Sequence, residues 1–170
     1  MPNWCINKLE VIGTVPAVSA FLDRCRENKN NLFASFLPHP EPQGAWYREH
    51  WYDWNSNTWG TKWESHDVVL PDNISPLEII AAQDDEMAEE IEFNSAWGPP
   101  HPVVYEIDKQ YPDLFFIHKW RVEGGNGVGE SQFENGEMLF QEYCSETTER
   151  GRDLMLEVAG YDLSEIEAEE

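Results

Sequence analysis

The stretch WCINKLEVIGTVPAVSAFLDRCREN, residues 4–28, predicts the first strand and the first helix of the fold. Residues 4–12 alternate imperfectly, which is typical of a strand whose two faces are both partly buried. Thr14 is a candidate N-cap, and Pro16 suits the first turn of a helix that runs to about Asn28. One face of this helix is apolar and carries Val18, Phe21, Leu22 and Cys25.

Hydrophobic patterning predicts further elements along the rest of the chain. The expected strands are 32–37, 62–70, 91–97 and 114–122, and the expected helices are 46–54 and 102–111. Ser75 and Pro76 open a helical or irregular stretch. Asn135 and Gly136 indicate a hairpin of strands 128–133 and 137–143, after which Ser145 is expected to cap a last helix that ends near Ala159.

This order of elements corresponds to the split βαβ plan. We therefore predict an α+β fold, a ferredoxin-like sandwich with an antiparallel sheet and two helices on one face, extended by a C-terminal β-hairpin and helix. Residues 1–144 form the expected ferredoxin-like domain, with a tryptophan-rich insertion at about 43–64. Residues 145–170 form an acidic helix and a frayed tail.

The 170 residues are enough for one domain, and the aromatic content of 13% excludes disorder of the whole chain. No apolar run is long enough for a transmembrane helix, and the N-terminus lacks a signal peptide, so a cytoplasmic product is expected. The cysteines are Cys5, Cys25 and Cys144, a set without a disulfide or zinc pattern. Since the histidines lack metal-site spacing too, we expect no metal, no cofactor and no enzyme activity.

Four sequence phrases occur here in a fixed order: MPNWCINKLEVIG at the start, NTWGTKWE at 57–64, FNSAWGPP at 93–100 and YPDLFF at 111–116. In this combination the chain resembles the YubB ferredoxin-like family of plasmid and phage proteins over residues 1–140. Glu64 stands where the family usually has Asp, and Ser95 where it usually has Thr; both changes keep the chemistry. The resemblance implies a ferredoxin-like fold, a mobile-element origin and expression in the bacterial host cytoplasm, but no reaction.

The chain is strongly acidic, with 33 acidic and 11 basic residues and a formal net charge of −22. This charge argues against direct binding to nucleic acid or to an anionic membrane. One explanation is solubility, with carboxylates on solvated faces or in a salt-adapted proteome. The other is mimicry, in which spaced carboxylates imitate DNA phosphates and occupy the groove of a basic partner.

Mimicry by a mobile-element protein leads to our first functional hypothesis. The protein would bind and inhibit a basic, nucleic-acid-binding host protein, such as a defence or CRISPR effector. The expected partner-binding carboxylates are Asp84, Asp85, Glu86, Glu89, Glu90, Glu92, Glu130, Glu134, Glu137, Glu142, Glu146, Glu149, Asp153 and Glu157. No pattern indicates an oligomeric state.

Five of the eight tryptophans lie within residues 46–63. They are explained either by packing of a small core or by a site for a small or single-stranded ligand. The second explanation is our alternative function, and the expected pocket residues are Asn57, Trp59, Thr61, Lys62, Trp63 and Trp97. A glycine-rich stretch at 124–129 precedes a strand rather than a helix, so we interpret it as a turn and not as a phosphate loop.

Overall fold

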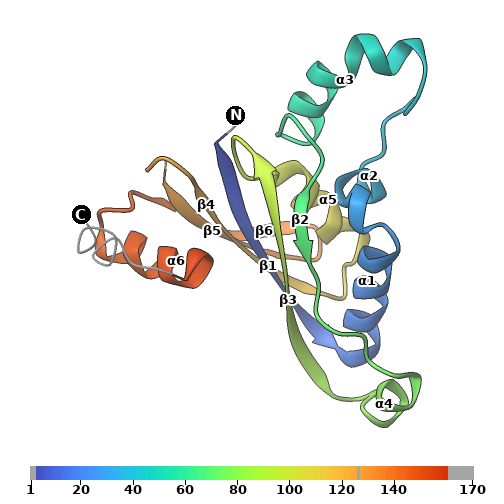
Figure 1. Ribbon diagram of the computed structural model, residues 1–170. Coiled ribbons are helices and arrows are strands. Elements are labelled where there is room, and N and C mark those ends of the chain that lie inside the picture. Colours follow the sequence, from blue (N-terminus) through green and yellow to red (C-terminus); the bar gives the residue numbers. More distant parts are fainter. Residues whose placement is uncertain (1–2, 126, 161–170) are drawn as a thin grey trace.

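A computed structural model describes residues 3–125 and 127–160 and shows one six-stranded antiparallel sheet in the order β2-β3-β1-β4-β5-β6 (Figure 1). The strands are β1 (Trp4–Thr14), β2 (His66–Val69), β3 (Glu86–Ala96), β4 (Phe115–Val122), β5 (Val128–Glu134) and β6 (Glu137–Cys144). The helices are α1 (Val15–Glu27), α2 (Leu32–Phe36), α3 (Ala45–Thr58), α4 (Pro76–Ala81), α5 (His101–Gln110) and α6 (Glu149–Ala159). A short 3₁₀ turn, Lys29–Asn31, joins α1 to α2.

The first four strands with α1 and α5 form a ferredoxin-like unit, because β1 lies between β3 and β4 and the two helices cover one face. The main core lies under these helices and joins Phe21 of α1 and Ile107 of α5 to Leu9 and Phe116 of the sheet. The hairpin β5–β6 extends the sheet beyond β4. The predicted fold class is confirmed.

Helix α6 packs on the opposite face of the sheet, which explains the imperfect alternation of the first strand. Leu154 and Met155 of α6 form a small second core with Val128 of β5. On β1, Leu9 faces the main core, whereas Lys8 points to the other face and pairs with carboxylates of β3. The second face of β1 is therefore partly covered, and its side chains are half-buried.

Residues 32–37 were predicted as a strand, but Leu32–Phe36 is the helix α2. A carboxylate distant in sequence stabilises the start of this helix. Oε1 of Glu64 accepts the backbone N–H of Phe33 at 2.6 Å, and Oε2 accepts that of Ala34 at 2.9 Å. These N–H groups have no partner within the helix, so the contact with Glu64 satisfies them.

The ends of other helices and strands differ from the sequence prediction by a few residues. Helix α3 runs on to Thr58, beyond the predicted end at 54, and β2 is limited to His66–Val69 rather than 62–70. The N-cap of α6 is Thr148, not Ser145, because the Thr148 side chain accepts the N–H of Gly151 at 3.0 Å. The predicted N-cap at Thr14 is confirmed, and the stretch that Ser75 and Pro76 open is the helix α4, with Ser75 as its N-cap.

Strand β6 forms one edge of the sheet and is largely exposed. Its outward side chains include large apolar groups, with exposed fractions of 49% for Met138 and 65% for Tyr143. The other edge is β2, which has only four residues. None of the described helices combines the length and the apolar character needed to cross a membrane.

Candidate functional site

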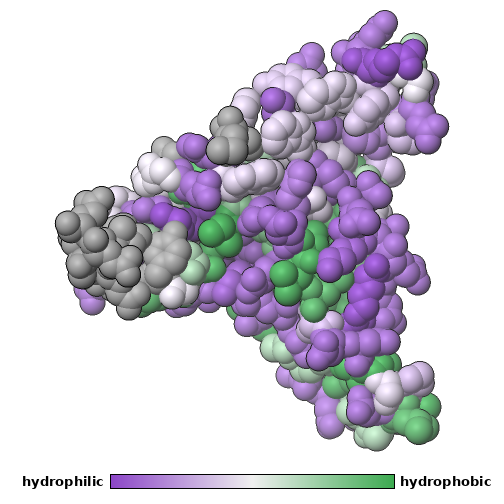
Figure 2. All heavy atoms as spheres, in the orientation of Figure 1, coloured by the Kyte–Doolittle hydropathy of each residue, from purple (hydrophilic) through white to green (hydrophobic). Residues whose placement is uncertain are grey.

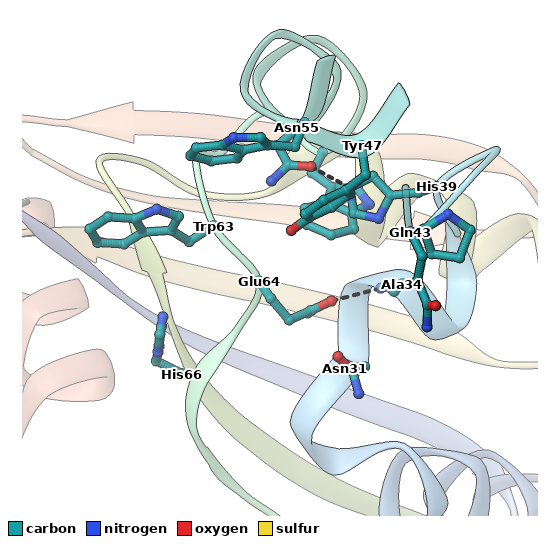
Figure 3. A pocket seen from close by; sticks show the side chains of 12 residues that line it. Asn31, Ala34, His39, Gln43, Tyr47, Asn55, Trp63, Glu64 and His66 are labelled. Atoms are coloured by element: carbon teal, nitrogen blue, oxygen red, sulfur yellow. Dashed lines mark hydrogen bonds between the residues drawn. The ribbon is translucent and has the colours of Figure 1, made fainter. Parts of the chain in front are cut away.

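A cavity of about 850 Å³ lies where α3 extends beyond the sheet, between this helix, α2 and the segment 59–66 (Figures 1 and 3). Its lining comes from one stretch of the chain, residues 31–66, which includes α2, the loop 37–44, α3 and the segment 59–66. The lining residues are Asn31, Ala34, His39, Pro42, Gln43, Tyr47, Trp51, Asn55, Trp59, Trp63, Glu64 and His66. Half of these residues are Tyr, Trp or His, and Glu64 is the one carboxylate among them.

One part of the lining is held in place by contacts among Trp59, His39 and Asn55. Trp59 is 2% exposed, and its indole N–H donates to the carbonyl of Leu37 at 2.8 Å. The His39 ring packs on Trp59 with centroids 4.8 Å apart. The Asn55 amide donates to the carbonyl of Lys62, so its oxygen accepts Nε2–H of His39 at 2.6 Å.

Glu64 forms the floor between the two sides of the cavity (Figure 3). Its Oε1 accepts from the N–H of Phe33 and from both the N–H and hydroxyl of Ser65, whereas Oε2 accepts only from Ala34 among the described residues. Burial raises the pKa of Glu64 above its usual value, and these hydrogen bonds oppose the rise. Oε2 retains capacity for a further donor.

Trp63 and His66 form the side opposite Tyr47, His39 and Gln43 (Figure 3). Trp4 of β1 supports this side, with its ring centroid 6.1 Å from Trp63 and 4.9 Å from His66. These contacts attach Trp63 and His66 to β1, a central strand of the sheet. The side is therefore positioned by the fold and not by α3.

The predicted pocket residues divide into three groups. Trp59 and Trp63 line the cavity. Thr61 is buried and donates its hydroxyl to the carbonyl of Trp63 at 2.8 Å, so it shapes the segment without facing the cavity. Lys62 and Trp97 lie outside the lining, where the ammonium group stands 5.2 Å from the Trp97 ring centroid. Asn57 is exposed and does not line the cavity either.

The sequence prediction missed His39, Gln43, Tyr47, Glu64 and several others. For part of this set a signal existed, because Tyr47, Trp51 and Asn55 are spaced by four residues and so share one face of a helix. Nothing local indicated His39 or Glu64, whose side chains reach the cavity from outside α3.

Six of the predicted partner-binding carboxylates form ion pairs within the chain. Arg150 of α6 reaches Glu130 at 2.7 Å and Glu142 at 2.6 Å, and Lys119 reaches Glu157 at 2.7 Å. The remaining three are Glu146, paired with Arg121, and Glu90 and Glu92, both paired with Lys8. Four of these ion pairs attach α6, or the segment just before it, to the sheet. The other two connect β1 to β3.

The other eight predicted carboxylates form no ion pair among the described residues. They are Asp84, Asp85, Glu86, Glu89, Glu134, Glu137, Glu149 and Asp153. The first four occupy the turn after α4 and the start of β3. All but the partly exposed Glu89 are exposed.

A separate polar cluster is buried between the sheet and α5. His118 is fully buried, and its Nε2–H donates to Asn7 Oδ1 at 2.9 Å, because the Asn7 amide donates to Ser95 Oγ at 2.9 Å. Nδ1 of His118 has no partner among the described residues. Burial, with a smaller effect of His101, lowers the pKa of His118 well below 6.5.

The cysteines and potential metal ligands do not form a recognisable reactive centre in the described part of the chain. Burial raises the pKa of both Cys5 and Cys25 to about 12, which keeps these thiols protonated at neutral pH. Among residues 3–125 and 127–160, no group of three or more His, Cys, Asp or Glu side chains could hold a metal ion.

Comparison with known proteins places the fold in a family. The chain is similar to a crystal structure of the protein Api92 from Yersinia pseudotuberculosis, with a TM-score of 0.55 and 9% sequence identity. The similarity covers 85% of this chain and 99% of that one. No curated protein has a significantly similar sequence. Residues 58–162 match the family described as "Ferredoxin-like domain in Api92-like protein", and the chain therefore belongs to that family.

Proposed function

We propose that this protein is a non-catalytic binding protein that takes a small organic ligand in the cavity between α3 and α2. The observation that carries the proposal is the cavity itself, which combines four large aromatic side chains with the remaining acceptor capacity of Glu64 Oε2. Ligand sites typically have this character, with apolar walls and a few convergent polar groups.

A small ligand fits this cavity better than single-stranded nucleic acid. Proteins that stack bases usually combine aromatic side chains with a basic groove. Among the described residues that line the cavity there is no lysine or arginine, and Glu64 adds a negative charge. The phrases NTWGTKWE and FNSAWGPP further support the proposal that this is a plasmid or phage protein, of the YubB type, in the host cytoplasm.

The test is a saturation-transfer NMR screen of neutral, cationic and anionic fragments of one or two rings. We expect at least one fragment to bind, and Trp63→Ala to weaken that binding about tenfold, since stacking on one aromatic ring contributes about 1–3 kcal/mol. Trp97→Ala is the matched control, because Trp97 is 54% exposed and lies outside the lining. Binding that survives Trp63→Ala, or no binding at all, would contradict the proposal.

A second candidate function is supported by the surface at α4. Leu77 and Ile80 are 78% and 65% exposed there, next in sequence to the unpaired carboxylates that begin at Asp84. Figure 2 shows apolar side chains gathered at the end of the molecule where α4 lies. Apolar residues rimmed by charge are characteristic of protein interfaces. We propose that a basic, nucleic-acid-binding host protein docks here, with the carboxylates in the place of phosphates.

Charge reversal tests this second candidate. A variant with Lys at Asp84, Asp85, Glu86 and Glu89 should lose the partner in a pull-down from host lysate, whereas Lys at Glu134, Glu137, Glu149 and Asp153 should retain it. Duplex DNA and a salt gradient should displace the partner from the wild-type protein, because the contact is electrostatic. If both variants retain the partner equally, or DNA fails to displace it, docking at α4 by mimicry is wrong.

A further inference from the structure

We infer that the cavity binds an organic cation whose charge is alkylated or delocalised, such as a quaternary ammonium group. This inference rests on the proposed function and specifies the ligand class for the same site. It follows from three features of the cavity: the arrangement of its aromatic rings, the position of its carboxylate and the distribution of basic side chains around it.

The aromatic rings surround the cavity on more than one side. Trp51 and Trp59 line the cavity. Tyr47 of α3 and Trp63 lie on opposite sides of it (Figure 3). The face of an aromatic ring carries partial negative charge and attracts a cation within about 6 Å of its centroid. Several rings around one space form a cage for a cation, whereas a single ring would provide only a stacking surface.

The structure already contains one such contact beside the cavity. The ammonium group of Lys62 lies 4.8 Å from the ring centroid of Trp63 and 5.7 Å from that of Tyr52. Lys62 itself is not part of the cavity lining. The Trp63 ring thus makes a cation–π contact with Lys62 and also borders the cavity.

Among the described lining residues the carboxylate is Glu64 and there is no lysine or arginine, which favours a cation over an anion, whereas the Lys62 ammonium lies outside the lining on the Trp63 ring. Glu64 provides a carboxylate at the floor, and Oε2 of this group has one hydrogen bond where it could accept more. Burial disfavours the ionised form of Glu64, and a cation placed next to it would offset that penalty. Lys29 lies beyond Glu64, where it lines an adjoining cavity of about 430 Å³ and not this one.

The lining also distinguishes between kinds of cation. Hard metal ions prefer six or more oxygen ligands, which this aromatic wall does not supply. A primary ammonium is strongly hydrated and loses more on entering such a site than an alkylated or delocalised cation does. The apolar rim of a trimethylammonium group would instead contact the rings directly. Aromatic surroundings with one carboxylate thus fit an organic cation best.

The decisive experiment compares two probes of the same shape that differ in charge. Choline and its neutral isostere 3,3-dimethyl-1-butanol are titrated into the full chain at pH 8, where histidine side chains are ordinarily neutral. Benzyltrimethylammonium serves as a larger cation, and benzoate as an anion. We expect choline to bind about tenfold more tightly than its isostere, the larger cation to bind more tightly still, and benzoate not to bind.

Variants assign the effect to this cavity. Trp63→Leu and Glu64→Gln should each reduce choline binding about fivefold or more, whereas Trp97→Leu should leave it unchanged. Because Glu64 also caps α2, its variant is accepted only if its circular dichroism matches the wild type, and Trp51→Leu replaces it otherwise. Equal affinity for choline and its isostere would overturn the cation inference but leave the pocket function standing. Failure of every probe and every screened fragment would overturn both.

Discussion

Replacing Trp59 with alanine should lower the free energy of unfolding by about 3–5 kcal/mol, the usual loss when a buried tryptophan is truncated. Trp59 is 2% exposed and packs against Phe33, with ring centroids 5.8 Å apart. The substitution would also leave the carbonyl of Leu37 without its indole donor. Urea denaturation followed by circular dichroism would measure the change.

The control for this prediction is Trp97→Ala, which should change the free energy of unfolding by less than about 0.5 kcal/mol, as is usual for surface substitutions. If the two variants were equally stable, Trp59 would not hold α3 onto the core as the structure indicates. Loss of a ligand in Trp59→Ala would report damage to the fold, so Trp63 is the better residue for testing the cavity.

Stability should fall as the pH drops below about 6.5, because His118 must stay neutral in the folded protein. Its folded-state pKa is lowered, so the unfolded chain takes up the proton first. The stabilisation is therefore fully present above the unfolded pKa and is lost as the pH falls toward the folded one. Below the unfolded pKa the loss approaches about 1.4 kcal/mol per pH unit while the folded imidazole stays neutral.

The matched variant is His118→Gln, whose amide can still donate to Asn7 Oδ1 but does not titrate. Chemical denaturation of both proteins between pH 8 and pH 5 isolates the effect, since other groups contribute equally to the two curves. The difference in unfolding free energy should shift in favour of His118→Gln as the pH falls. Parallel curves would show that His118 is protonated at little cost in the folded state.

Most of the fold could be predicted because its signals are local. The strand predicted at 114–122, the helix start at Ser75 and the Asn135–Gly136 turn each depend on neighbouring residues. Helix α2 could not be predicted in this way. Its sequence has strand character, and its helical start is satisfied by Glu64, about 30 residues further along the chain. A helix stabilised from a distance leaves no signal in its own residues.

The candidate site could be predicted only in part for the same reason. The tryptophan-rich segment indicated the region, and Trp59 and Trp63 are part of the cavity lining. The acidic set was harder to interpret, since charge alone cannot separate a free carboxylate from a paired one. Glu130 and Glu142 look like surface residues in sequence, yet both are held by Arg150 on a different element.

Strand β6 shows why so large a negative charge can be useful to a chain of this shape. An uncovered strand with exposed Leu139 and Phe140 is a template on which another copy could add a strand. Copies that each carry a charge of −22 repel one another over the screening length, which is about 8 Å in physiological salt and about 3 Å at 1 M. Electrostatic repulsion between molecules thus opposes edge-to-edge association at β6, and concentrated salt weakens this repulsion.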